Sequence, residues 1–315
     1  MDLDSLHHYC RIHGLAEAAL SAEARALVYS VALPRFLELF EQCQIPATFF
    51  VIGEDAEEAF SKNSLTRAVA EGHELGNHSH THPYALSRWG REDLSRELSS
   101  AALALQRVSG VRPVGFRAPG YTLSPLLYEV LEAQGYLYDS SAFPATPYHA
   151  AKACVMGLLS LLGRPSQSIL DSPRVLFAPR TPYFPCRTAP YRRGDGRTLE
   201  LPMAVAPWTR IPFIGTLVMA MPWPLVEWVY RSARRTSFFN FELHAVDLLD
   251  ARDGIPAGLV KQQRDLAIPW EQKRDRLRQV LGWLARDFVP CTLQTAATRL
   301  GAGGQLPVEK QSSPV

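Results

Sequence analysis

GHELGNHSHTH, residues 72–82, places three of the nine histidines of the chain within five positions, 78–82. Imidazole is the commonest protein ligand for transition metals, and packing alone does not explain this clustering. The preceding residues, 73–77, predict a short strand that delivers the histidines at its end. The stretch therefore predicts a metal site of the kind that activates water.

Strand-like and helix-like segments alternate around this stretch. The apolar patterns predict strands at 47–53, 73–77, 114–117 and 136–139, and helices at 34–43, 61–71, 91–109 and 124–134. Further along, they predict a strand at 238–244, a helix at 270–286 and a last strand at 288–293. Such alternation indicates a parallel sheet, and a length of 315 residues favours a barrel over an open sheet.

The domain organisation follows from where the alternation of strands and helices is interrupted. We expect one barrel domain over residues 1–300, with a proline-rich insertion at about 144–235 that contains an apolar helix at 151–162. We expect residues 301–315 to form a disordered tail. Residues 211–230 are long and almost uncharged, but Pro222, Pro224 and Glu227 interrupt them, so a membrane span is disfavoured.

Composition narrows the classes of function. A net charge of +2 gives no electrostatic reason to expect nucleic acid as a partner. The five cysteines are scattered without a CxxC pair, which argues against a disulfide framework and fits a reducing compartment. The chain opens with acidic residues and not with a basic, then apolar leader. We therefore expect a cytoplasmic protein, and peripheral contact with the inner membrane stays open.

Polar residues that could perform chemistry lie at the ends of predicted strands, where α/β barrels build their active sites. They are Asp2, Asp4, His78, His82, Arg117, Asp139 and His244. Two histidines and one carboxylate would hold a metal and leave a position open for water, while hydrolysis also needs a base and an acid. Plainer interpretations stay open: Asp2 and Asp4 as a solvated chain end or helix cap, and His244 as an ordinary strand-end histidine.

Taken together, these motifs resemble the polysaccharide deacetylase family, the NodB-homology or carbohydrate esterase 4 family. The motifs that match are Asp2-Leu3-Asp4, in the Asp-x-Asp form of the intracellular branch, His78–His82, Arg117-Ala118-Pro119-Gly120, Asp139 without the usual tryptophan, and Leu243-His244. The resemblance implies a distorted (β/α)7-8 barrel. Members of the family carry a full strand before the aspartate pair, so the first strand here is expected to be truncated or to be completed by sequence ahead of Met1.

The resemblance also implies a role for each candidate. Asp4, His78 and His82 would be the metal ligands. Asp2 would act as general base with Arg117 orienting it, and His244 would protonate the leaving amine. Asp139 or Asp247 would tune His244, and the sequence does not decide between them. The cofactor is a divalent metal, and the donor set favours zinc.

We therefore expect a metal-dependent deacylase, either a deacetylase or a deformylase, that hydrolyses the amide of an N-acylated amino sugar. The two apolar segments, with Arg231, Arg234 and Arg235 after the second, favour a lipid-linked or cell-envelope glycan and a membrane-surface contact. One alternative is an amidohydrolase of the same fold that acts on a small cyclic amide. Another is a non-catalytic sugar-binding member. The oligomeric state is left open.

Overall fold

A parallel sheet forms the framework of the protein. The computed structural model describes residues 1–15, 20–161 and 171–301. Five strands pair in parallel in the order β1-β2-β3-β4-β7. Their bounds are β1 (Thr48–Val51), β2 (Glu74–Asn77), β3 (Gly115–Phe116), β4 (Tyr138–Asp139) and β7 (Leu199–Glu200). A separate antiparallel hairpin consists of β5 (Pro185–Cys186) and β6 (Ala189–Arg193).

Two short segments close this sheet into a ring. Asp2 forms parallel bridges with Phe50 on one side and with His244 on the other. Beyond β7, the amide of Ala204 donates to the carbonyl of Asn240 at 2.9 Å, which joins the other edge of the sheet to the segment that carries His244. The ring confirms a (β/α)7-8 type barrel, and Asp2 is held by backbone pairing on both sides.

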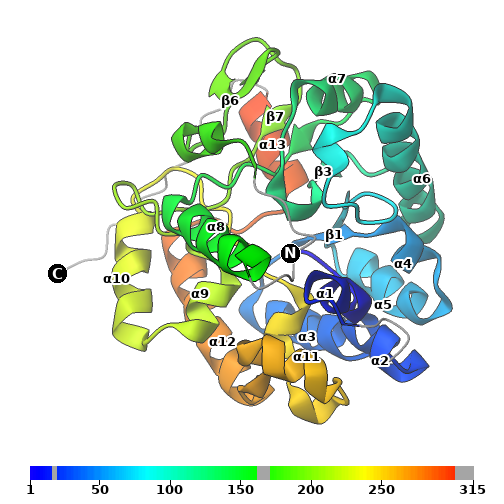
Figure 1. Cartoon of the computed structure of the whole chain (residues 1–315), viewed down its shortest axis with the longest axis vertical. Coiled ribbons are helices and arrows are strands. Elements are labelled where there is room, and N and C mark those ends of the chain that lie inside the picture. Colours follow the sequence, from blue (N-terminus) through cyan, green and yellow to red (C-terminus); the bar gives the residue numbers. More distant parts are fainter. Residues whose placement is uncertain (16–19, 162–170, 302–315) are drawn as a thin grey trace.

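Helices surround the barrel (Figure 1). In the first half of the chain they are α1 (Leu6–Ile12), α2 (Ala22–Leu27), α3 (Leu33–Cys43), α4 (Gly53–Glu57), α5 (Ala59–Ala70), α6 (Arg91–Ser109) and α7 (Pro125–Ala133). In the second half they are α8 (Thr146–Leu161), α9 (Gly215–Ala220), α10 (Trp223–Ala233), α11 (Ala257–Gln262), α12 (Trp270–Asp287) and α13 (Leu293–Gly301). The main core lies between the sheet and this layer, where Phe36 and Phe40 of α3 are buried with Phe49 of β1.

Most predicted elements are present, but two predicted strands are wrong. Residues 238–244 run in the barrel wall, yet they form only isolated bridges, so no regular strand develops. Residues 288–293 form no strand, and α13 begins at Leu293. The amides of Leu293 and Gln294 donate to the side chains of Thr48 and Glu74 at 2.8 and 2.9 Å. These side chains accept hydrogen bonds from backbone N–H groups in the first turn of α13, so a helix begins where a strand was expected.

The predicted insertion at about 144–235 includes part of the barrel, because β7 lies inside it. Its apolar helix is α8, and residue 162 of the predicted span lies outside the described residues. In the uncharged run at 211–230, Pro222 separates α9 from α10. Within the described residues, no helix is long and apolar enough to cross a membrane. Gly301 ends α13, and the rest of the predicted disordered tail lies outside the description.

The end of the barrel where the strands begin contains a cavity with a mixed lining. Its volume is about 530 Å³, and its lining includes Phe238, Phe241 and Leu284. Met1 also lines it, and the α-amino group of Met1 is buried and donates to the carbonyl of Thr48 at 2.7 Å. Burial lowers the pKa of this amino group to about 5. The polar candidates lie at the opposite end of the strands.

Candidate metal centre

The histidine loop after β2 is held in an unusual backbone shape. Ser79 and His82 have φ angles of 64° and 56°, which lie in a left-handed region that residues other than glycine rarely adopt. The amide of Ser79 donates to Oδ1 of Asn77 at 2.8 Å, and the amide of His82 donates to Oγ of Ser79 at 3.1 Å. From α6, one oxygen of Glu97 accepts from the amides of His80 and Thr81. These bonds fix the direction of the imidazoles.

Asp4, His78 and His82 converge as the sequence predicted. Oδ1 of Asp4 lies 3.3 Å from Nε2 of His78 and 3.6 Å from Nε2 of His82. All three residues are buried, and Oδ1 of Asp4 has no hydrogen-bond partner. Nδ1 of His78 lies 2.8 Å from the carbonyl of Arg117, which orients the ring with Nε2 toward Asp4.

This donor set fits a divalent ion. A carboxylate oxygen and two imidazole nitrogens are the ligands of hydrolytic zinc sites, and a cation would satisfy the buried oxygen of Asp4 that faces both rings. Burial lowers the pKa of His82 to about 4, so its ring is neutral and can act as a ligand. Burial would also lower the pKa of His78, but Asp2 and Asp4 outweigh that effect and raise it.

Asp2 lies beside this centre in a buried ion pair. Nη1 of Arg117 donates to Oδ1 of Asp2 at 2.6 Å, and neither side chain is exposed by more than 1%. Arg117 is itself fixed by Ser140, whose carbonyl and hydroxyl oxygens each accept from the guanidinium at 2.9 Å. Burial would raise the pKa of Asp2, but the positive charges around it, that of Arg117 first among them, together lower it. Asp2 is therefore ionised.

His244 approaches Asp2 through two residues that the sequence analysis did not identify. Oε1 of Glu242 lies 2.8 Å from Nδ1 of His244. The hydroxyl of Tyr121 lies 3.1 Å from Nε2 of His244 and 3.2 Å from an oxygen of Asp2. Burial would lower the pKa of His244, but the charge and hydrogen bond of Glu242 raise it to about 10. Glu242 and His244 share one face of an extended chain, so their two-residue spacing was a usable signal.

The carboxyl groups that hydrogen-bond or pair with the ring of His244 do not include those of Asp139 and Asp247, the residues expected to tune it, within the described residues. The carboxylate of Asp247 accepts from the backbone amide of His244 at 2.9 Å. Asp139 lies in a separate buried cluster, where it accepts from Ser141 and Tyr128, and where Tyr128 also donates to Glu200 at 2.6 Å. The structure therefore gives Glu242 the position that was expected for Asp139 or Asp247.

Three other histidines, one of them from the cluster, have different surroundings. His80 points away from the centre, because its Nδ1 would lie 2.3 Å from a Cβ placed on Gly53. Only glycine leaves room there for this ring. His73 accepts the amide of Ala47 at 3.0 Å and is structural. His8, from α1, packs on His82 with 4.5 Å between ring centroids.

Comparison with known proteins agrees with this architecture. Residues 28–138 match the family model of the polysaccharide deacetylases, a range that contains His78, His82 and Arg117. The peptidoglycan deacetylase of Helicobacter pylori is 28% identical over 151 residues, which are 47% of this chain and 50% of that protein. A chitooligosaccharide deacetylase of Sinorhizobium fredii is 41% identical over 76 residues, 24% of this chain and 34% of that protein. The matched part of the chain, residues 28–138, is similar to the polysaccharide deacetylases.

A solved structure extends the likeness of fold to the whole chain. A crystal structure from Mycobacterium smegmatis, assigned to the polysaccharide deacetylases, aligns with a TM-score of 0.59. The alignment covers 100% of this chain and 92% of that one at 18% identity. The matches to the two curated relatives span half of their length or less. The fold is therefore shared throughout, while activity is argued from the site.

Proposed function

We propose that this protein is a metal-dependent deacylase that hydrolyses the amide of an N-acylated amino sugar. The observation that carries the proposal is the joint placement of three groups at one end of the barrel. These are the ligand set of Asp4, His78 and His82, the ionised Asp2 and the charged His244. The set combines a place for a Lewis acid, a base and an acid, which are the requirements for hydrolysing an unactivated amide.

Asp2 is placed to accept the proton of the attacking water. A divalent ion held by Asp4, His78 and His82 would polarise the acyl carbonyl and lower the pKa of a water molecule. Oδ1 of Asp2 is occupied by Arg117 at 2.6 Å, while Oδ2 is shared with the hydroxyl of Tyr121 at 3.2 Å. Oδ2 is therefore the oxygen that can take a proton, and the guanidinium keeps the carboxylate oriented.

His244 is placed to protonate the departing nitrogen. Its pKa of about 10 means that the imidazole is charged at neutral pH and holds a proton to donate. Glu242 occupies Nδ1, so Nε2 is the nitrogen that faces Tyr121 and the centre. His244 is 23% exposed at its side chain, whereas Asp2 is 1% exposed, so substrate reaches the site from the side of His244.

The substrate class is inferred from the relatives, which are named for peptidoglycan and chitooligosaccharide. N-acetylated amino sugars are common to both, so an acetyl or formyl group on such a sugar is the proposed target. The test is release of acetate or formate from chitin oligomers and peptidoglycan fragments by zinc-loaded protein, with a panel of small cyclic amides in parallel. Activity on the amides alone would replace this proposal by the amidohydrolase alternative.

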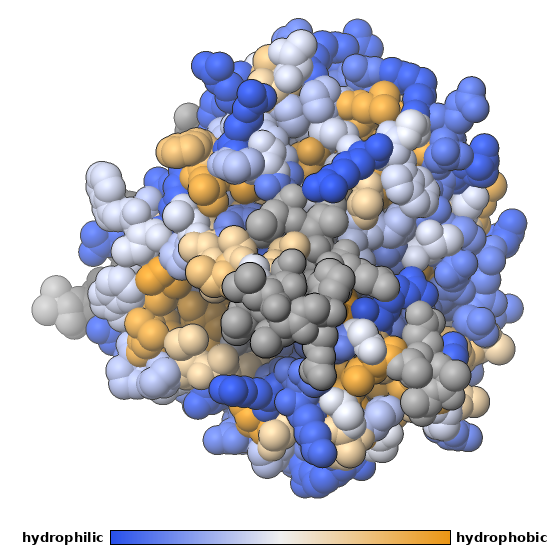
Figure 2. Space-filling view, viewed as in Figure 1, coloured by the Kyte–Doolittle hydropathy of each residue, from blue (hydrophilic) through white to orange (hydrophobic). Residues whose placement is uncertain are grey.

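We also propose that the sugar is lipid-linked or part of the cell envelope, and that the protein meets it at a membrane surface. The support is an exposed apolar strip on α10, where Leu225 and Trp228 are 38% and 50% exposed and Met221 lies just ahead of the helix. Figure 2 shows hydrophobic surface over α9 and α10. Isolated exposed apolar residues are ordinary, but a contiguous group beside positive charge suits an anionic membrane.

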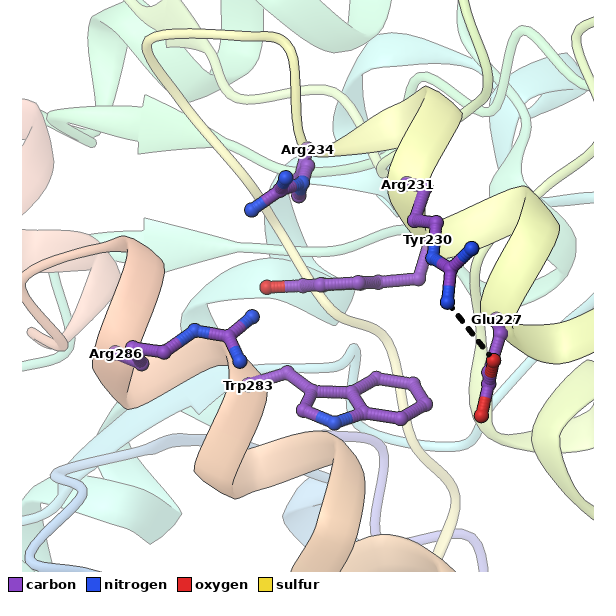
Figure 3. Close-up of a pocket in the computed structure, with 6 residues that line it drawn as sticks. All are labelled: Glu227, Tyr230, Arg231, Arg234, Trp283 and Arg286. Atoms are coloured by element: carbon purple, nitrogen blue, oxygen red, sulfur yellow. Dashed lines mark hydrogen bonds and ion pairs between the residues drawn. The ribbon is translucent and has the colours of Figure 1, made fainter. Parts of the chain in front are cut away.

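The positive charge lies at the end of the same helix. Arg231, Arg234 and Arg286 surround Tyr230 and Trp283 at a surface cavity of about 160 Å³ (Figure 3). Arg231 pairs with Glu227, and Arg234 pairs with Asp287. Lipid headgroup phosphates would compete for these guanidinium groups where the apolar strip meets the bilayer.

Vesicle flotation tests the membrane proposal. Wild type should float with vesicles containing anionic lipid at low salt and should be released as salt rises, because surface charge is screened. Leu225→Ser with Trp228→Ser should stay with the soluble fraction. Trp208→Ser, which removes an exposed tryptophan outside α10, is the matched control and should float as wild type does. Wild type that stays soluble at low salt would overturn the membrane proposal.

A further inference from the structure

His8 is a buried imidazole whose nitrogens have no partners. It lies on α1, the helix that begins two residues after Asp4, and it is 1% exposed. Neither Nδ1 nor Nε2 has a hydrogen-bond partner. A buried polar group without a partner is costly, so a side chain in this condition generally binds something. The ring rests on His82 at 4.5 Å between centroids, which places it directly beside the metal centre.

Two further donors lie next to His8. Asp55 is 3% exposed and lies on α4, where its Oδ2 accepts from the hydroxyl of Ser5 at 2.7 Å. His7 is half-buried, and its ring packs on that of His8 with 3.8 Å between centroids. His7, His8 and Asp55 each offer one ligand atom, and these atoms all lie within 4.8 Å of one another. Two imidazoles and one carboxylate repeat the composition of the set formed by Asp4, His78 and His82.

We propose that His7, His8 and Asp55 form a second binding site for a divalent transition-metal ion, adjacent to the first. The chemistry of the donors selects an ion of the zinc type, because imidazole nitrogens dominate the set. Both ring nitrogens of His8 are buried without a hydrogen-bond partner, so either one is available as a ligand. The partial exposure of His7 gives the ion a route from solvent.

The two sites are neighbours through the contact of His8 with His82. Paired metal sites are common in hydrolases, where two ions share the stabilisation of one reacting group. The proposal concerns binding alone and does not depend on the deacylase activity. It also gives a role to the two consecutive histidines in the first turn of α1, the helix that begins two residues after Asp4.

Metal stoichiometry tests this site. Chelator-stripped protein is dialysed to equilibrium against buffered free zinc, and bound zinc is measured by mass spectrometry. Wild type should bind about two equivalents per chain, as expected for two separate donor sets. His8→Phe keeps an aromatic ring against His82 but removes both nitrogens, and it should bind about one. Asp4→Asn should also bind about one, and the double variant should bind none.

His13→Gln is the matched control, because it removes an exposed imidazole just past α1 and should leave both equivalents in place. A melting curve of the stripped protein adds a second readout. His8→Phe should melt at or above the wild-type temperature without metal, because it removes an unpartnered buried group, and it should gain less from added zinc.

One equivalent in wild type and none in Asp4→Asn would overturn the second site, as would two equivalents in His8→Phe or a loss in His13→Gln. These outcomes are independent of the proposed function. Two bound equivalents without deacylase activity would support the second metal site and contradict the proposed function. One bound equivalent with full deacylase activity would contradict the second site and support the proposed function.

Discussion

Two buried carboxylate clusters lie at the ends of barrel strands, and they differ in one partner. Asp2 faces the guanidinium of Arg117, which lowers its pKa. Asp139 faces another carboxyl group, Glu200, and burial raises the pKa of both. Burial is complete in each cluster, so burial alone does not decide the charge. The neighbouring cation makes the first cluster a charged site, while the second holds a proton and acts as a structural link between β4 and β7.

The largest effect should follow from removing that cation. Arg117→Met leaves Asp2 as a buried charge without a partner, and we expect a loss of about 3–5 kcal/mol in the free energy of unfolding. Urea denaturation measures it. Arg91→Met, which breaks an exposed pair with Glu129, is the control and should cost less than about 1 kcal/mol. Equal losses in the two variants would show that the Asp2 cluster does not depend on its counter-ion.

Asp2, the proposed base, should matter for the reaction rate more than for folding. Asp2→Asn should reduce kcat for sugar deacylation by about 10²–10⁴-fold, the usual contribution of a general base. The matched variant in the other cluster, Asp139→Asn, should leave kcat within about tenfold, because Asp139 contacts Tyr128 and Ser141 and not the reacting groups. Similar losses in the two variants would return Asp139 to the catalytic role that its sequence motif suggested.

Removing the partner of His244 should change a pH dependence. The raised pKa of His244 stabilises the folded protein fully below 6.5 and loses this contribution as pH rises through about 10. In Glu242→Gln, the pKa should fall toward 6.5, so wild type should lose stability relative to the variant between these values. Melting temperatures across this range measure the difference, and an NMR titration of His244 measures the pKa. Parallel stability curves would contradict the role given to Glu242.

The smallest effect should come from the second carboxylate cluster. The raised pKa of Glu200 means that the folded state binds more protons than the unfolded chain, so this pair costs stability as pH rises above 4.5. Glu200→Gln places a neutral amide there, and its stability should stay within about 1 kcal/mol of wild type near pH 5. At higher pH the variant should become the more stable of the two. A variant that stays less stable at pH 8 would show that the pair is ionised.

The sequence was most informative where a local pattern matches a local structure. Residues 91–109 carry a helical pattern, and α6 has those bounds. Asp4, His78 and His82 were candidates because parallel strands end at the same edge, and the family resemblance implied that these three form one ligand set. The helix at α13 was missed because its first turn is satisfied by Thr48 and Glu74, which are distant in sequence. The pairing of Asp139 with Glu200 was missed for the same reason. The two residues are 61 positions apart, so no local sequence pattern indicates their contact.

The pairing of Asp2 has a practical consequence for engineering the protein. Asp2 bridges to Phe50 on one side and to His244 on the other, so the segment that carries the proposed base is also part of the barrel wall. A substitution that displaces this segment would disturb the wall and the carboxylate together. Variants near Asp2 should therefore be compared by melting curve as well as by rate.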